Sequence, residues 1–240
     1  MATGSDRRYM TRSQAAAAAV DVGLRTYMLR VYNYMALGVA LTGIIALAVA
    51  MNPAIMQAIA LGPMKWVLFI GIIGLGFVAP RLIMGGSTVT AQAAFWVYAA
   101  LWGALIAPLF YVYTGESVVR VFFITSAAFA GTSLYGYTTK RDLGPIGSFL
   151  AMSTIGILVA VLVNAFFFQS SGFQYLMSFV VVLVFAGLTA YETQMIKNVY
   201  LDSDHGDVVT RKAIFGAFML YGSFVTMFVW LLQIFGVARD

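Results

Sequence analysis

The sequence contains no cysteine and only one histidine among its 240 residues. Without thiols the chain forms no disulfides, thiolate metal sites or cysteine nucleophiles. The Gly-x-Ser-x-Gly, His-Glu-x-x-His and phosphate-loop patterns are also missing, and His205 alone does not make a triad or a zinc site. The sequence therefore predicts a protein that is not an enzyme, with no catalytic residues and no resident cofactor.

Charge is scarce along the whole chain. Charged residues make up 10% of the sequence and hydrophobic residues 62%, with a mean hydropathy of +0.90. A soluble domain carries about 25% charged residues, so this chain lacks the polar side chains needed to cover a water-facing surface. The composition predicts an integral membrane protein whose main partner is the lipid bilayer. The excess of basic residues indicates membrane orientation and not nucleic-acid binding.

Seven apolar segments follow one another, separated by short breaks rich in Gly, Pro, Asn and Ser. A membrane-spanning helix needs roughly 20 apolar residues, and each segment has about that length. The segments are residues 31–51, 65–83, 91–113, 117–137, 146–168, 175–196 and 213–235. We therefore expect an all-α, polytopic bundle of seven transmembrane helices over residues 31–240.

The first 30 residues are polar and basic, and we expect them to form a cytoplasmic N-terminal tail. Residues 21–30 are expected to form an amphipathic helix that lies at the membrane surface and leads into the first span. With the N-terminus inside, eleven of the fourteen Lys and Arg residues fall on the inner side. Under the positive-inside rule this asymmetry predicts a cytoplasmic N-terminus, and seven spans then place the C-terminus outside.

Ionisable residues inside the spans are rare, and Glu192 is the clearest of them. A carboxylate within a span costs a few kcal/mol and is a functional candidate by default. The alternative interpretation pairs Glu192 with Lys197, five residues further on. Glu116 and Arg120 have the i,i+4 spacing of an ordinary ion pair, and Asn164 is expected to make an interhelical hydrogen bond.

Three stretches together resemble the bacterial branch of the Bax inhibitor-1 family of seven-span membrane proteins. They are residues 133–142 (SLYGYTTKRD), residues 187–197 (GLTAYETQMIK) and the last span around residues 220–224 (LYGSF). The resemblance implies a bundle with a central C-terminal helix, in a bacterial inner membrane. It also implies a pH-sensitive leak with calcium as the permeant ion.

The same resemblance implies the site residues. In the family, two facing acidic residues lie in the sixth and seventh spans, and an arginine at the end of the second span acts as a latch. Glu192 matches the first acid and the calcium ligand, whereas Ser223 stands where the family has aspartate. Thr226 replaces the usual asparagine, and Arg81 is the candidate latch. Since one carboxylate beside a serine loses like-charge coupling and makes a poor calcium site, we expect a divergent member.

A different class of function stays open beside the leak. Some bacterial relatives are associated with a membrane-bound ATP-dependent protease, and the polar tail of residues 1–14 is long enough for such a machine to grip. In this alternative the protein modulates the protease and has no transport activity of its own.

The topology is testable with reporter fusions. A reporter fused after Asp240 and one inserted in the loop of residues 138–145 are expected on opposite sides of the membrane, because three spans separate them. Labelling of both reporters from the same side would contradict the seven-span arrangement.

Overall fold

The computed structural model describes the backbone of residues 12–239 and the side chains of residues 22–239. The proposed protease-binding tail of residues 1–14 therefore lies almost entirely outside the described residues. The helices are α1 (Arg12–Ala50), α2 (Pro53–Ala60), α3 (Met64–Gly85), α4 (Thr88–Ile106), α5 (Leu109–Val112), α6 (Gly115–Thr138), α7 (Gly144–Val163), the π-helix η2 (Asn164–Phe168), α8 (Ser171–Val199) and α9 (Asp207–Phe235).

Within this described part, seven helical segments are long and apolar enough to cross a membrane, which confirms the predicted spans. The structure adds two features to the expected pattern. The short helix α2 follows Asn52, whose side chain caps it, and the third span breaks at Pro108, so that α5 continues it as a separate turn. Proline removes a backbone donor and interrupts helical hydrogen bonding, which explains the break.

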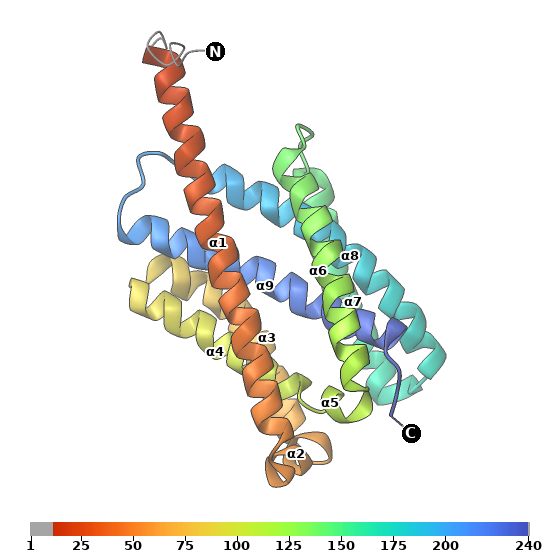
Figure 1. Cartoon of the computed structure of the whole chain (residues 1–240). Coiled ribbons are helices and arrows are strands. Elements are labelled where there is room, and N and C mark those ends of the chain that lie inside the picture. The colour runs from red at the N-terminus through yellow and green to blue at the C-terminus, as the bar shows by residue number, and fades with distance from the viewer. Residues whose placement is uncertain (1–11, 240) are drawn as a thin grey trace, which may run out of the picture.

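The C-terminal helix α9 occupies the centre of the bundle (Figure 1). It packs against α1, α3, α4, α6 and α8, and 67% of its most apolar stretch is buried. The predicted central position of the last helix is confirmed. Helix α7 instead lies at the periphery, where it packs on α8 and only 6% of its corresponding stretch is buried.

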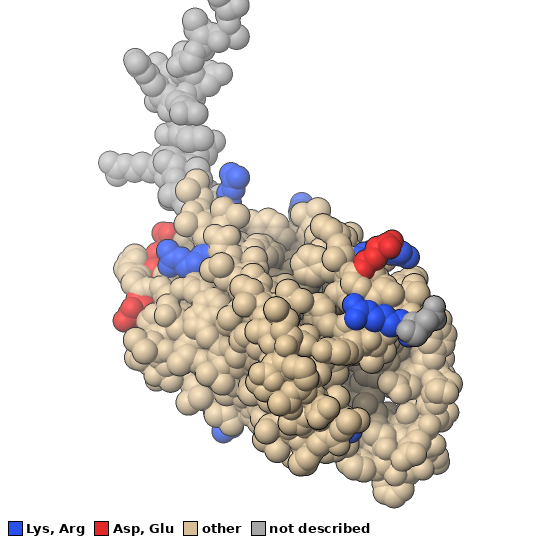
Figure 2. Space-filling view, turned by 60° about the horizontal axis from the view of Figure 1, so that its bottom comes forward, with Lys and Arg blue, Asp and Glu red and all other residues tan. Residues whose placement is uncertain are grey.

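The outer surface of the bundle is apolar. Large hydrophobic side chains such as Phe77, Phe123, Met152 and Leu183 are mostly exposed, and Figure 2 shows charged side chains around the edge of a broad uncharged surface. A contiguous apolar exterior of this kind is unfavourable in water and suits the hydrocarbon of a bilayer.

Residues 21–30 do not form a separate surface helix, so that prediction is wrong. They are part of the single long helix α1, which runs without a break from Arg12 to Ala50. Tyr27 and Met28 are buried, and the Tyr27 hydroxyl donates to the carbonyl of Lys212 at 3.3 Å. No proline interrupts the segment, and its side chains pack against the start of α9, so the helix continues.

Basic side chains cap the helices that end where α1 begins. The last carbonyl groups of a helix lack partners and carry partial negative charge, so a cation there is stabilising. The ends of α3, α6 and α8 are each capped by a basic side chain of a neighbouring helix, α8 or α9. The contacts are Arg211 Nη1 to the carbonyls of Met84 (3.0 Å) and Gly86 (2.7 Å), Lys197 Nζ to that of Tyr137 (2.9 Å), and Lys212 Nζ to that of Val199 (3.0 Å).

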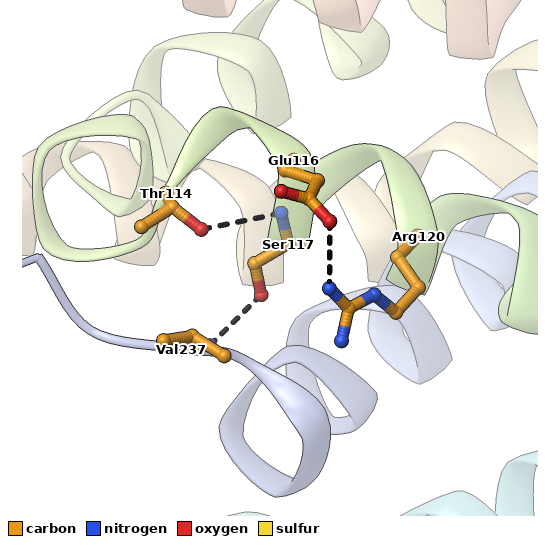
Figure 3. Close-up of polar contacts among 5 residues, drawn as sticks. All are labelled: Thr114, Glu116, Ser117, Arg120 and Val237. Carbon is orange, nitrogen blue, oxygen red and sulfur yellow. Dashed lines mark hydrogen bonds and ion pairs between the residues drawn. The ribbon is translucent and has the colours of Figure 1, made fainter.

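The opposite end of α9 is held by the chain that follows it (Figure 3). The amide of Val237 donates to Ser117 Oγ at 2.8 Å, and its carbonyl accepts from the amide of Thr114 at 3.0 Å. Nearby on α6, Arg120 and Glu116 form the predicted i,i+4 ion pair at 3.0 Å. These contacts attach the C-terminal segment to the start of α6.

Asn164 does not make the predicted interhelical hydrogen bond, so that prediction is wrong. Its side-chain oxygen accepts from the amide of Ser170 at 3.1 Å, and its side-chain nitrogen donates to the carbonyl of Ser170 at 3.3 Å. The turn between η2 and α8 contains Gln169 with a left-handed φ of 48°. Asn164 satisfies backbone groups of this turn, as short amide side chains often do.

Close packing of α6 on α8 generates a stability prediction. A Cβ at Gly136 would overlap the backbone oxygen of Ala190, whereas a Cβ at Gly131 on the same helix meets nothing within 4 Å. We expect Gly136→Ala to lower the free energy of unfolding by about 1–3 kcal/mol. Gly131→Ala should be neutral or stabilising by up to about 1 kcal/mol. Unfolding of both variants in detergent, followed by circular dichroism, checks this difference, and equal stabilities would contradict it.

Candidate functional site

A carboxylate and a hydroxyl meet between α8 and the central helix α9. Ser223 Oγ donates to Glu192 Oε2 at 2.8 Å, and both residues are buried, with 8% of Glu192 and 2% of Ser223 exposed. The two helices share the most extensive contact in the bundle. The structure therefore brings together the two residues that match the acidic pair of the family.

Glu192 has no cationic partner among residues 22–239, where the ion pairs are Arg120–Glu116 and Lys212–Asp204. The alternative pairing with Lys197 does not occur, because Lys197 donates to the carbonyl of Tyr137 and caps α6. An unpaired carboxylate in this position is costly when it is charged. No basic side chain among residues 22–239 is therefore placed to neutralise a charge on Glu192.

Two tyrosines lie next to the site, Tyr98 of α4 and Tyr221 of α9 itself. The ring centroid of Tyr98, in α4, lies 4.5 Å from that of Phe218 and 5.8 Å from that of Tyr221. Its hydroxyl lies 3.6 Å from where a Cβ of Gly222 would be, beside Ser223. Tyr221 is completely buried, and its hydroxyl bonds to Thr42 Oγ1 at 2.6 Å. These rings fix the position of α9 around Ser223.

A chain of hydroxyl groups links three helices close to Glu192. The Tyr32 hydroxyl of α1 bonds to Ser133 Oγ of α6 at 2.7 Å, and Ser133 Oγ bonds to Thr193 Oγ1 of α8 at 2.9 Å. Thr193 donates onward to the carbonyl of Thr189 at 2.8 Å. Sequence reasoning missed this chain, although Ser133 and Thr193 both lie in the stretches that carry the family resemblance.

The two remaining candidate residues are not joined to Glu192. Thr226 lies one turn beyond Ser223 on α9 and is partly buried, and its side chain makes no hydrogen bond within residues 22–239. Arg81 is exposed on α3 and makes no hydrogen bond or ion pair with any described residue. No contact in this structure joins Arg81 to Glu192.

Metal-binding capacity at the site is low. In the part of the chain that the structure describes, no group of three or more His, Asp or Glu side chains is arranged to hold a metal ion. Glu192 supplies the one carboxylate at the α8–α9 contact, and calcium prefers six to eight oxygen ligands. The arrangement suits a single reversible proton or a weakly held cation.

Among residues 22–239, seven apolar helices and an apolar exterior define a polytopic α-helical membrane protein, in which Glu192 is the buried carboxylate. The profile of the family described as "Inhibitor of apoptosis-promoting Bax1" matches residues 24–240. The chain belongs to this family, the Bax inhibitor-1 family, as its three motifs predicted.

Bacterial proteins resemble the chain over nearly their full length. The Rickettsia prowazekii protein named "Uncharacterized protein RP147" is 40% identical over 223 residues, which cover 92% of this chain and 93% of that protein. The Escherichia coli inner membrane protein YbhL is 38% identical over 220 residues, which cover 90% of this chain and 94% of YbhL. A Caulobacter vibrioides protein is 37% identical over 233 residues, which cover 92% of each chain.

Proposed function

We propose that this Bax inhibitor-1 family protein is a pH-sensitive cation leak, with calcium as a permeant ion and Glu192 as its titrating group. The observation that carries the proposal is the 2.8 Å hydrogen bond from Ser223 to the buried carboxylate of Glu192. A permeation path that is governed by protonation needs an ionisable group inside the membrane and next to a helix that is able to move.

The Glu192–Ser223 contact is compatible with two protonation states. An ionised carboxylate accepts a hydrogen bond from the hydroxyl of Ser223, whereas a protonated carboxylic acid donates a hydrogen bond to Ser223 Oγ. The hydrogen bond therefore persists while the charge between α8 and α9 changes. With only one carboxylate at this contact, titration is a single step without the like-charge coupling of an acidic pair.

Calcium interacts weakly with such a site. Glu192, Ser223 and Thr226 offer one negative charge and two hydroxyl oxygens, so water would have to supply most of the ligands. Because calcium binds the ionised carboxylate, protons and calcium compete for Glu192. In this proposal calcium is a transient permeant ion, and its effect weakens as the pH falls.

The proposal includes an orientation. Like its relative YbhL, which is named an inner membrane protein, the chain would lie in the bacterial inner membrane, with a cytoplasmic N-terminus and an external C-terminus. The helix-capping cations Lys197, Arg211 and Lys212 would then face the cytoplasm, in agreement with the positive-inside rule. Arg81 would act on Glu192 only in a second conformation.

The acid pair can be tested by restoring its second member. In liposomes that contain only this protein, wild-type calcium flux should depend on pH through a single titration step. We expect Ser223→Asp to add a second titration step and to strengthen the calcium dependence, because two adjacent carboxylates titrate as a coupled pair and bind a divalent ion better. Ser223→Asn is the matched control, since asparagine has the shape of aspartate but does not titrate.

The same assay with Glu192→Gln should show flux that no longer responds to pH, because glutamine keeps the hydrogen bonding but cannot titrate. The control Glu116→Gln alters an exposed carboxylate outside this site and should behave as wild type. If neither Glu192→Gln nor Ser223→Asp changed flux or its pH profile, the leak site would be wrong. A role as modulator of a membrane-bound protease would then be the stronger hypothesis.

A further inference from the structure

Helices α1 and α6 both pack against α9 but have few contacts with each other (Figure 1). Between them lies a groove of about 170 Å³, whose floor is formed by Phe224, Val225 and Phe228 of α9. Gly43 lines the groove from α1, and Val119 lines it from α6. A Cβ at Gly43 would meet nothing within 4 Å, so the space beside α1 is open.

The lining of the groove is suited to hydrocarbon and not to a polar ligand. Thr42 is its one polar side chain, and the donor of that hydroxyl is already used. Thr42 Oγ1 lies 2.9 Å from the carbonyl of Gly38, 3.0 Å from that of Ala99 and 2.6 Å from the hydroxyl of Tyr221. A hydroxyl has one donor and two acceptor sites. The two carbonyl groups share its donor and the Tyr221 hydroxyl occupies one acceptor site, so Thr42 has no donor left for a phosphate headgroup.

The depth of the groove places it in one leaflet. Thr42 lies eight residues before the end of α1, and Phe228 lies seven residues before the end of α9. At 1.5 Å per residue these side chains are about 10–12 Å from the helix ends, within one half of a hydrocarbon core of about 30 Å. Toward the opposite end of α6, five residues before the helix ends, the bond between Ser133 and Tyr32 joins α6 to α1.

The groove is continuous with the lipid-exposed surface. Val119 at its edge is 56% exposed and Phe122 is 37% exposed, so the opening faces the bilayer. An apolar protein cavity of about 150 Å³ is large enough to bind a hydrocarbon the size of benzene, and this groove is slightly larger. We propose that it binds the acyl chain of a membrane phospholipid, in the leaflet where α1 ends.

An acyl chain in this groove would contact the helix that carries Ser223. Phe224 directly follows Ser223 in α9. Its ring centroid lies 5.8 Å from that of Phe122 and 5.6 Å from that of Phe129. Lipid binding would thus support α9 from the side that α1 and α6 leave uncovered. This site does not depend on the proposed leak, because no lining residue belongs to the Glu192–Ser223 pair.

The experiment uses the full chain in vesicles of phosphatidylethanolamine and phosphatidylglycerol, with a trace of phosphatidylglycerol that carries a photoactivatable diazirine in the middle of one acyl chain. Bulk lipid labels exposed residues such as Met152 and Ile155 of α7. Only a chain inside the groove reaches Phe224 and Phe228, which are buried by protein. Peptide mapping by mass spectrometry is expected to find label at Phe224 or Phe228, which is the α9 label meant below, in addition to label on α7.

Variants that fill the groove supply the control. Gly43→Phe, and separately Val119→Trp, should remove the label from α9 and leave α7 labelling unchanged. Ile44→Phe changes the neighbouring, 65% exposed residue and should keep the α9 label. The proposal is overturned if wild-type α9 carries no label, or if label on α9 persists in both groove-filling variants.

Discussion

The burial of α9 by its neighbours is the constraint on which the rest of this structure depends. Inside a bilayer there is little hydrophobic drive for helices to associate, so close packing and interhelical hydrogen bonds hold them together. At Gly216 a Cβ would lie 2.9 Å from Ile196, and Tyr221 is bonded to Thr42 at 2.6 Å. Helix α9 is therefore fixed against α8 on one side and α1 on another, and Ser223 is held at Glu192.

This constraint gives the candidate site its character. Glu192 faces α9, which offers its carboxylate the hydroxyl of Ser223 but no basic side chain. The nearby cations serve the ends of helices instead: Lys197 caps α6, and Arg211 caps α3. Basic residues therefore stabilise one end of the bundle, while Glu192, the one buried carboxylate among residues 22–239, has no cation beside it. That division supports a role for Glu192 as a pH-responsive group.

Hydropathy was sufficient to predict the seven spans, and the rarity of intramembrane acids was sufficient to select Glu192. The family motifs identified Ser223 as its partner. Contacts between helices were not predictable from composition, because they depend on rotation and distance. The hydroxyl chain from Tyr32 to Thr193 was missed for this reason. The hydrogen bond of Asn164 is predicted to reach another helix, but backbone groups of its own turn use that side chain. Residues 21–30 are predicted to form a separate helix, but they continue into the first span without a break.

The most direct test of a titrating Glu192 is an infrared difference spectrum of the protein in lipid membranes, recorded between acidic and alkaline pH. The account predicts a carboxylic acid C=O band that disappears on alkalinisation and is absent from Glu192→Gln. The band should shift in Ser223→Ala, because that change removes its hydrogen-bond partner. A difference spectrum identical in wild type and Glu192→Gln would contradict the account, because Glu192 would then keep one protonation state throughout.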